Sequence, residues 1–188
     1  MQIRLAAPIQ YDSIVDGEGM RAVLWTQGCS HNCKGCHNPM THDFKGGFLT
    51  DTKEVMDELK DNIKYEDGLT LSGGDPFMQA DAVCEIASYV QSLGKNVWAY
   101  TGFTYEKLIE MSKNNPKIIE LLKNVDVLVD GKFVLELKSL DLFYMGSSNQ
   151  RVIDVKKSLK QNQVVLIEKY NTVKKQTNMR PKEDYMFI

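Results

Sequence analysis

Short apolar strands alternate with amphipathic helices along most of this chain, and that alternation limits the folds open to it. Strands of mostly buried residues that alternate with one-sided apolar helices predict a mostly parallel sheet covered by helices. We therefore expect an α/β fold. The expected elements, in chain order, are strand 20–26, helix 51–64, strand 68–72, helix 79–93, strand 96–100, a helical segment 104–123 that breaks near Asn115 and Pro116, and strands 125–129, 151–155 and 163–168.

The segments of most unusual composition each follow an expected strand. The cysteine-rich stretch 28–39 follows the first strand, 72–76 the second, 101–102 the third and 130–132 the fourth. The carboxyl ends of parallel strands lie at one edge of a sheet, and binding sites form there. We expect these four segments to meet at the same edge.

Composition excludes several classes of protein. The chain has 188 residues, is 43% hydrophobic and carries a formal net charge of −2. Its length suits one domain, expected over 1–168, and the lack of a basic surplus argues against a nucleic-acid partner. No apolar run is long enough to span a membrane, and no leader pattern opens the chain. We expect a cytoplasmic protein, whose reducing surroundings disfavour disulfides.

Residues 169–188 form a tail that differs in charge from the rest of the chain. The tail has five basic and two acidic side chains. It is either a solvated chain end or a segment that docks on an acidic partner, and the sequence leaves both interpretations open.

Three cysteines lie within eight residues of one another, at Cys29, Cys33 and Cys36. Thiolates at such short spacings hold iron–sulfur clusters, because one loop can wrap the cluster. Three thiolates cannot saturate four irons, and an open metal position is typical of catalysis. We expect a 4Fe-4S cluster with one iron that has no protein ligand.

Other interpretations of the same cysteines stay open. Zinc is possible, if the three thiolates and His31 or His37 complete a Cys3His site. Residues 33–37 also fit the attachment motif of a c-type haem, which needs export and leaves the first cysteine without a role, and 33–36 fit a thioredoxin-like pair. Cys84 lies inside an expected helix and is interpreted as a small apolar core residue.

A glycine-rich turn follows the second expected strand. Gly73 and Gly74 leave backbone groups open to close approach by a ligand, and their carbonyls could accept hydrogen bonds from an ammonium group. Asp75 could orient that turn. Asp130 and Lys132, after the fourth strand, either meet a zwitterionic ligand or pair on the surface.

The cysteine loop and the glycine turn together resemble those of the radical S-adenosylmethionine (SAM) superfamily. Two positions depart from its usual pattern: Gly35 stands where an aromatic residue is common, and Asp75 where glutamate is common. Within the superfamily, the chain from about Ile14 to Val155 resembles the activating proteins of anaerobic ribonucleoside-triphosphate reductase. The segments that carry this resemblance are Asp16–Gly19, Arg21, Gln27–Cys29, Cys36–Pro39, Ser72–Pro76, Asp130–Phe133 and Gly146–Arg151.

That resemblance implies an incomplete β/α barrel of the radical SAM type and a reaction. The enzyme would cleave SAM reductively at the open iron and generate a glycyl radical on the reductase, with an electron donor such as flavodoxin. Side-chain acid–base catalysis is not expected. The implied iron ligands are Cys29, Cys33 and Cys36, and the implied SAM contacts are Gly35, Cys36, His37, Gly73, Gly74, Asp130 and Lys132. Residues 149–151 could face either SAM or the incoming glycine loop.

Three other functions remain open at this stage. The chain could activate another glycyl-radical enzyme, or it could be a radical SAM enzyme that acts on a small molecule. It could also be a zinc-stabilised binding protein without catalysis.

Overall fold

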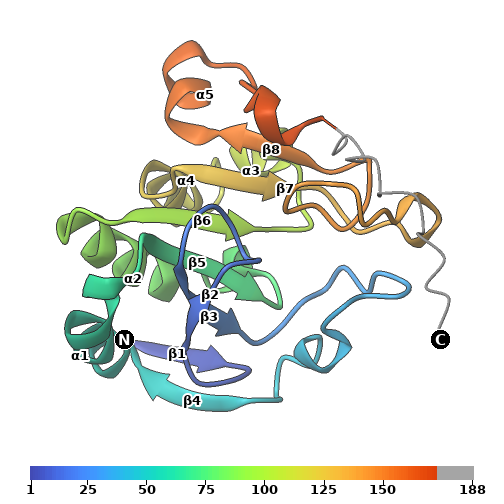
Figure 1. Cartoon of the computed structure of the whole chain (residues 1–188). Coiled ribbons are helices and arrows are strands. Elements are labelled where there is room, and N and C mark those ends of the chain that lie inside the picture. The colour runs from blue at the N-terminus through green and yellow to red at the C-terminus, as the bar shows by residue number, and fades with distance from the viewer. Residues whose placement is uncertain (173–188) are drawn as a thin grey trace, which may run out of the picture.

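The structure, a computed structural model that describes residues 1–172, is built on one eight-stranded sheet. The strand order is β4-β1-β3-β5-β6-β7-β8, and β2 pairs with β3 beside this path (Figure 1). The strands are β1 (Gln2–Leu5), β2 (Gln10–Ser13), β3 (Arg21–Thr26), β4 (Phe48–Asp51), β5 (Gly68–Gly73), β6 (Asn96–Tyr100), β7 (Val127–Asp130) and β8 (Arg151–Asp154).

The centre of the sheet is parallel and its edges are antiparallel. Strands β3, β5, β6 and β7 pair in parallel, in sequence order. All pairings of β1, β2, β4 and β8 are antiparallel. The expected α/β class is confirmed, with a mixed sheet whose parallel part is the expected one.

Within residues 1–172, five α-helices form a layer against the sheet. They are α1 (Thr52–Asn62), α2 (Ala80–Ser92), α3 (Tyr105–Met111), α4 (Pro116–Lys123) and α5 (Val155–Gln161). Asp51, Thr104, Asn115 and Asp154 each cap a helix, because their side chains accept a hydrogen bond from a backbone N–H in the first turn. Pro116 begins α4, which explains why the expected helical segment 104–123 is two helices.

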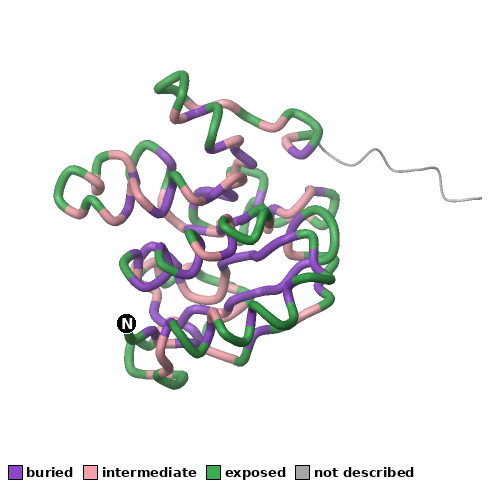
Figure 2. The backbone as a smooth tube through the Cα atoms, turned by 90° about the vertical axis from the view of Figure 1, so that its left-hand side faces the viewer, coloured by how far each residue is buried: buried purple, intermediate pink, exposed green. Residues whose placement is uncertain are grey.

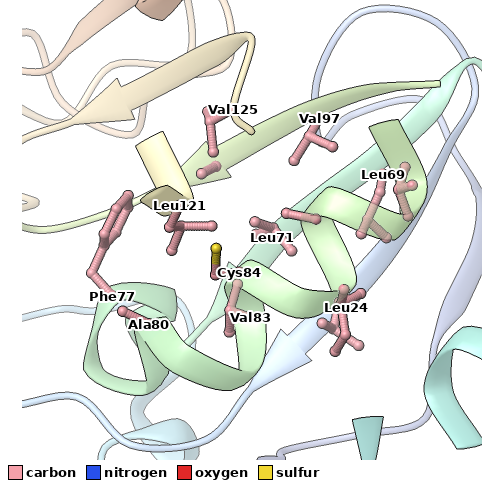
Figure 3. Packing of buried hydrophobic residues seen from close by; sticks show 14 of the residues in the cluster. Leu24, Leu69, Leu71, Phe77, Ala80, Val83, Cys84, Val97, Leu121 and Val125 are labelled. Carbon is pink, nitrogen blue, oxygen red and sulfur yellow. The ribbon is translucent and has the colours of Figure 1, made fainter. Parts of the chain in front are cut away.

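The core lies between the helices and one face of the sheet. Alternation along β6 shows the two faces: Val97 and Ala99 pack toward the helices, and Trp98 and Tyr100 point the other way. Cys84, 7% exposed, packs inside this core beside Leu71 and Leu121 (Figure 3), as expected for an apolar core residue. Figure 2 shows the buried backbone running through the middle of the molecule, with exposed residues around it.

The opposite face of the sheet is covered in part by the end of the described chain. The second cluster joins Trp98, Val129, Leu142, Met145, Val152 and Tyr170. The expected strand 163–168 is wrong, because Leu166 forms only an isolated bridge with Ile153, and the chain then enters the 3₁₀ helix η5 (Glu168–Tyr170).

The start of the expected tail belongs to the packed structure. Tyr170 is buried against Trp98, and Lys169 pairs with Glu18 at 2.8 Å. Residues 173–188, the remainder of that tail, lie outside the described residues. Within residues 1–172 no helix is long and apolar enough to cross a membrane.

Candidate cluster and cofactor site

A cavity of about 830 Å³ opens at the carboxyl ends of the parallel strands. Trp25, Ser72 and Tyr100, near the ends of β3, β5 and β6, form its floor on the sheet face that the helices leave free. The arrowheads of β5, β6 and β7 point toward this side, where the cysteine loop and segment 131–150 also lie (Figure 1). The expected edge of the sheet is therefore the edge that is hollowed.

All three clustered cysteines line this cavity. Cys29, Cys33 and Cys36 are half-buried, and none forms a disulfide. Burial raises the pKa of the Cys29 thiol most, and the charges of Asp75, Cys33 and Cys36 raise it further, because all four groups lie close together.

The cysteine loop has a fixed shape. Its two ends meet where the N–H groups of Gly28 and Cys29 donate to the carbonyls of Thr41 (2.8 Å) and His42 (3.2 Å). The Gln27 side chain donates to the carbonyls of Met40 and Asp43, at 3.1 and 2.6 Å, and so closes the loop from inside.

Gly35 explains one departure from the superfamily pattern. Its φ is +73°, a left-handed conformation that favours glycine. A Cβ at this position would lie 2.9 Å from Cδ1 of Leu135, so the leucine occupies the space that a side chain at 35 would need. Gly35 itself is not part of the cavity wall.

The donor set fits an iron–sulfur cluster better than a single ion. Across the described residues, no three His, Cys, Asp or Glu side chains are arranged to hold one metal ion. Each thiolate of a four-iron cluster binds its own iron, so its ligands stand farther apart than those of one ion. The two histidines of the zinc alternative are engaged elsewhere: His31 pairs with Asp75 at 2.7 Å, and the His37 ring packs on Phe133 at 4.9 Å.

The glycine turn joins the cysteine loop by its backbone. Gly74 N–H donates to the carbonyl of Thr26 at 2.7 Å, and Asp75 N–H donates to that of Gly28 at 2.9 Å. Gly73 and Gly74 both line the cavity. Asp75 orients the turn as expected, since its carboxylate accepts from Phe77 N–H and caps the 3₁₀ helix η3 (Pro76–Gln79).

At the end of β7, Asp130 is buried and forms an ion pair with Arg151. Asp130 is 1% exposed, and its carboxylate accepts from both Arg151 and the N–H of Tyr105. Neither Asp130 nor the exposed Lys132 lines the cavity; Phe133 does. Arg151 also pairs with Glu106 and lowers the pKa of that carboxyl to about 2.

The segment Gly146–Arg151 holds the two ends of the β7–β8 connection together at the cavity wall. Gln150 Oε1 accepts from the N–H groups of Gly146 (2.8 Å) and Ser147 (3.2 Å), and its Nε2 donates to the carbonyl of Gly131 (2.9 Å). Asn149 Nδ2 donates to the carbonyl of Lys132 at 2.8 Å. Of residues 149–151, only Gln150 reaches the cavity.

Arg21 is a buried cation that holds the Asp16–Gly19 loop. It is 0% exposed, donates to Thr70 Oγ1 (2.6 Å) and to the carbonyls of Leu69 and Glu18, and lies over the Trp98 ring at 5.4 Å. Burial lowers its pKa to about 10, so the side chain stays charged at neutral pH. The loop that it supports places Asp16 at the cavity.

Sequence reasoning missed the wall formed by segment 138–146. Leu142, Phe143, Tyr144 and Met145 line the cavity from a stretch without regular secondary structure. No motif marks that stretch, whereas Tyr100 could have been found as the last residue of an expected strand.

Residues 15–153 match the family model of the 4Fe-4S single cluster domain. The chain is 37% identical over 145 residues to the anaerobic ribonucleoside-triphosphate reductase-activating protein of Haemophilus influenzae, an alignment that covers 73% of this chain and 89% of the relative. The chain belongs to the anaerobic ribonucleoside-triphosphate reductase-activating protein family. Other members of this family align at similar levels: that of Escherichia coli K12 is 38% identical over 147 residues (74% and 91% coverage), and that of phage T4 is 36% identical over 155 residues (77% and 93%).

This membership confirms the family that the sequence motifs indicate, and the family model confirms an iron–sulfur cluster domain over most of the described chain. The crystal structure of QueE from Escherichia coli is similar over 55% of this chain and 54% of QueE, at 13% identity and a TM-score of 0.45, which is too weak to carry an argument.

Proposed function

We propose that this chain holds a 4Fe-4S cluster on Cys29, Cys33 and Cys36 and, with SAM, generates a glycyl radical on anaerobic ribonucleoside-triphosphate reductase. One observation carries the proposal: in a member of the activating-protein family, the three thiols and the glycine turn line one cavity at the carboxyl edge of the sheet. When bound, the cluster and SAM supply one-electron cleavage of a carbon–sulfur bond, which starts the radical chemistry.

The chain's own residues bind and orient these groups. Three thiolates leave one iron without a protein ligand, because Cys84, the remaining cysteine, lies in the core. Gly73 and Gly74 offer backbone groups to the amino end of SAM, and Cys36 and His37 lie at the adenine or cluster-bound end. All of these SAM contacts stay predictions, as do those of Gly35, Asp130 and Lys132.

Aromatic side chains limit the access of water to the cavity. Trp25, Tyr100, Phe133, Phe143 and Tyr144 line it from four different segments. Burial raises the pKa of Tyr100, so its hydroxyl stays neutral at physiological pH. A wall of neutral aromatic groups protects a reactive radical from solvent.

The proposal also covers the protein substrate, the electron donor and the cellular location. The sheet runs as an open path from β4 to β8, which supports a partial barrel whose open side admits a peptide loop carrying the target glycine. A small cytoplasmic donor such as flavodoxin would supply the electron, and we propose that the chain acts in the cytoplasm.

An anaerobic reconstitution tests the proposal directly. The chain, loaded with iron and sulfide, is incubated with SAM, a strong reductant and the reductase, and electron paramagnetic resonance records the glycine-centred signal. Cys29→Ala, Cys33→Ala and Cys36→Ala are each expected to lose SAM cleavage and the signal. Cys84→Ala, which removes a thiol from the core instead, is the matched control and should keep its iron content.

The same experiment separates the alternatives. SAM cleavage without a glycine signal would indicate a small-molecule substrate or another glycyl-radical enzyme. A colourless protein that holds one zinc per chain would contradict the proposal and favour a binding protein. Normal SAM cleavage by any of the three cysteine variants would show that the ligand assignment is wrong.

A further inference from the structure

The Asp75 carboxylate lies where three segments of the cavity wall meet. It is fully buried, and Oδ2 accepts from Thr101 Oγ1 (2.8 Å), Gly102 N–H (3.0 Å) and His31 Nε2 (2.7 Å). Its other oxygen accepts from Phe77 N–H at 3.0 Å. A buried carboxylate needs such donors, and these come from the cysteine loop, from η3 after the glycine turn and from the two residues that follow β6.

His31 is seated as firmly as its partner. Its side chain is 6% exposed, and its ring meets Phe103 edge-on with 4.5 Å between the ring centroids. A Cβ at position 102 would lie 2.3 Å from Cδ2 of His31, so the ring lies against backbone that only glycine leaves open. His31 is thus fixed by residues that follow β6, a strand separate from its own loop.

The His31–Asp75 hydrogen bond matters because His31 lies inside the cysteine loop. His31 lies between Cys29 and Cys33 in the cysteine loop. The backbone bonds of Gly74 and Asp75 reach only the chain from Thr26 to Gly28, before the first thiol. Among the hydrogen bonds of residues 1–172, the one between the His31 side chain and Asp75 joins the glycine turn to the part of the loop between two thiols.

We propose that His31 is a positioning residue that clamps the cysteine loop to the glycine turn through Asp75. The clamp fixes the distance between the thiols that hold the cluster and the Gly73–Gly74 backbone that faces SAM. The clamp itself rests on the structure alone. Its effect on SAM binding rests on the proposed function. Without His31, Asp75 keeps three donors, so the fold survives while the loop loosens.

The clamp can be measured in the metal-free protein. In His31→Ala, the rates at which an alkylating reagent labels Cys29 and Cys33, read by peptide mass spectrometry, should rise several-fold. Cys84, in the core of the same chain, should label at the wild-type rate. Asn115→Ala is the control for general destabilisation, because it removes the cap of α4 and costs about 1 kcal/mol. Its effect should appear at Cys84, whose neighbour Asn124 follows α4.

The reconstituted protein gives the second measurement. His31→Ala should retain iron, since all three thiols remain, but its KM for SAM should rise about 10-fold, as expected for a lost hydrogen bond to a charged group, with a smaller change in kcat. His31→Gln, whose amide can still donate to Asp75, should recover most of both effects.

Three results would overturn the clamp: unchanged labelling of Cys29 and Cys33 in His31→Ala, equal increases at all four cysteines, or no recovery in His31→Gln. Failure of the wild-type protein to cleave SAM would instead contradict the proposed function. The labelling result, which is measured in the metal-free protein, would still test the clamp.

Discussion

Arg151 determines the environment of Asp130, the acidic residue at the end of β7. Asp130 and Arg151 face each other across β7 and β8, and their ion pair involves a carboxylate for which the sequence left two roles open, a ligand contact or a charge pair. The sequence marks both residues but not their register, because an antiparallel partner 21 positions away is a non-local contact. The cysteines, by contrast, could be predicted from spacing alone, since one loop carries all three.

Replacement of Glu106 tests the charge network around Arg151. The pKa of Glu106 is lowered to about 2 from a usual value of 4.5, first through the hydrogen bond from Arg151. Its contribution to stability is therefore complete above about pH 4.5 and is lost as the pH falls toward 2. Glu106 is well exposed, so Glu106→Gln should lower the free energy of unfolding by no more than about 1 kcal/mol at pH 7.

Urea unfolding of the metal-free protein at several pH values measures this difference. The gap between wild type and Glu106→Gln should shrink between pH 4.5 and the lowest pH at which the protein folds. In an Arg151→Ala background the same substitution should have little effect. A gap that stays constant with pH would show that Arg151 does not stabilise the charged carboxylate.

At the scale of elements, long buried strands and capped helices could be predicted, and short or half-exposed elements could not. Strands β1, β2 and β4 have four residues each, and each exposes one or two of them, so no long apolar run marks them. The apolar run within 163–168 misleads for another reason. Val164 packs toward the helices and Ile167 toward the second cluster, so these side chains serve both faces of the sheet at its edge without forming a strand.

Gln150 allows a test at the same scale, because its amide joins the start and the end of the connection between β7 and β8. Gln150→Leu removes three hydrogen bonds and leaves backbone donors of Gly146 and Ser147 unpaired, which should cost about 2 kcal/mol. Hydrogen exchange at those two amides should become faster in the metal-free protein. Asn149→Leu, which loses one exposed bond, is the matched control and should cost about 0.5 kcal/mol. Equal effects of the two variants would contradict the bridging role of Gln150.

At the scale of the whole molecule, the two faces of the sheet have different tasks. Helices cover one face and form the main core, and the other face carries aromatic packing beside the cavity. Lys169 and Tyr170 close the second face, through the ion pair with Glu18 and the packing on Trp98. The strand-end rule placed the cysteine loop, the glycine turn and Thr101–Gly102 together because it depends only on strand direction. Segment 138–146 follows no such rule and could be placed only by the structure.

A truncation after Thr172 tests whether the basic tail docks on the reductase. Tyr170 and Asn171 must stay, because Tyr170 packs in the second cluster and the Asn171 side chain bonds the backbone of Val152. Residues 173–188 carry four basic and two acidic side chains, so docking on an acidic surface should weaken with salt. The truncated protein should then cleave SAM at the normal rate, while its activation of the reductase falls about 10-fold at low salt and loses its salt dependence. Equal losses of SAM cleavage and activation would count against docking, because they would place the effect of the tail on the cavity itself.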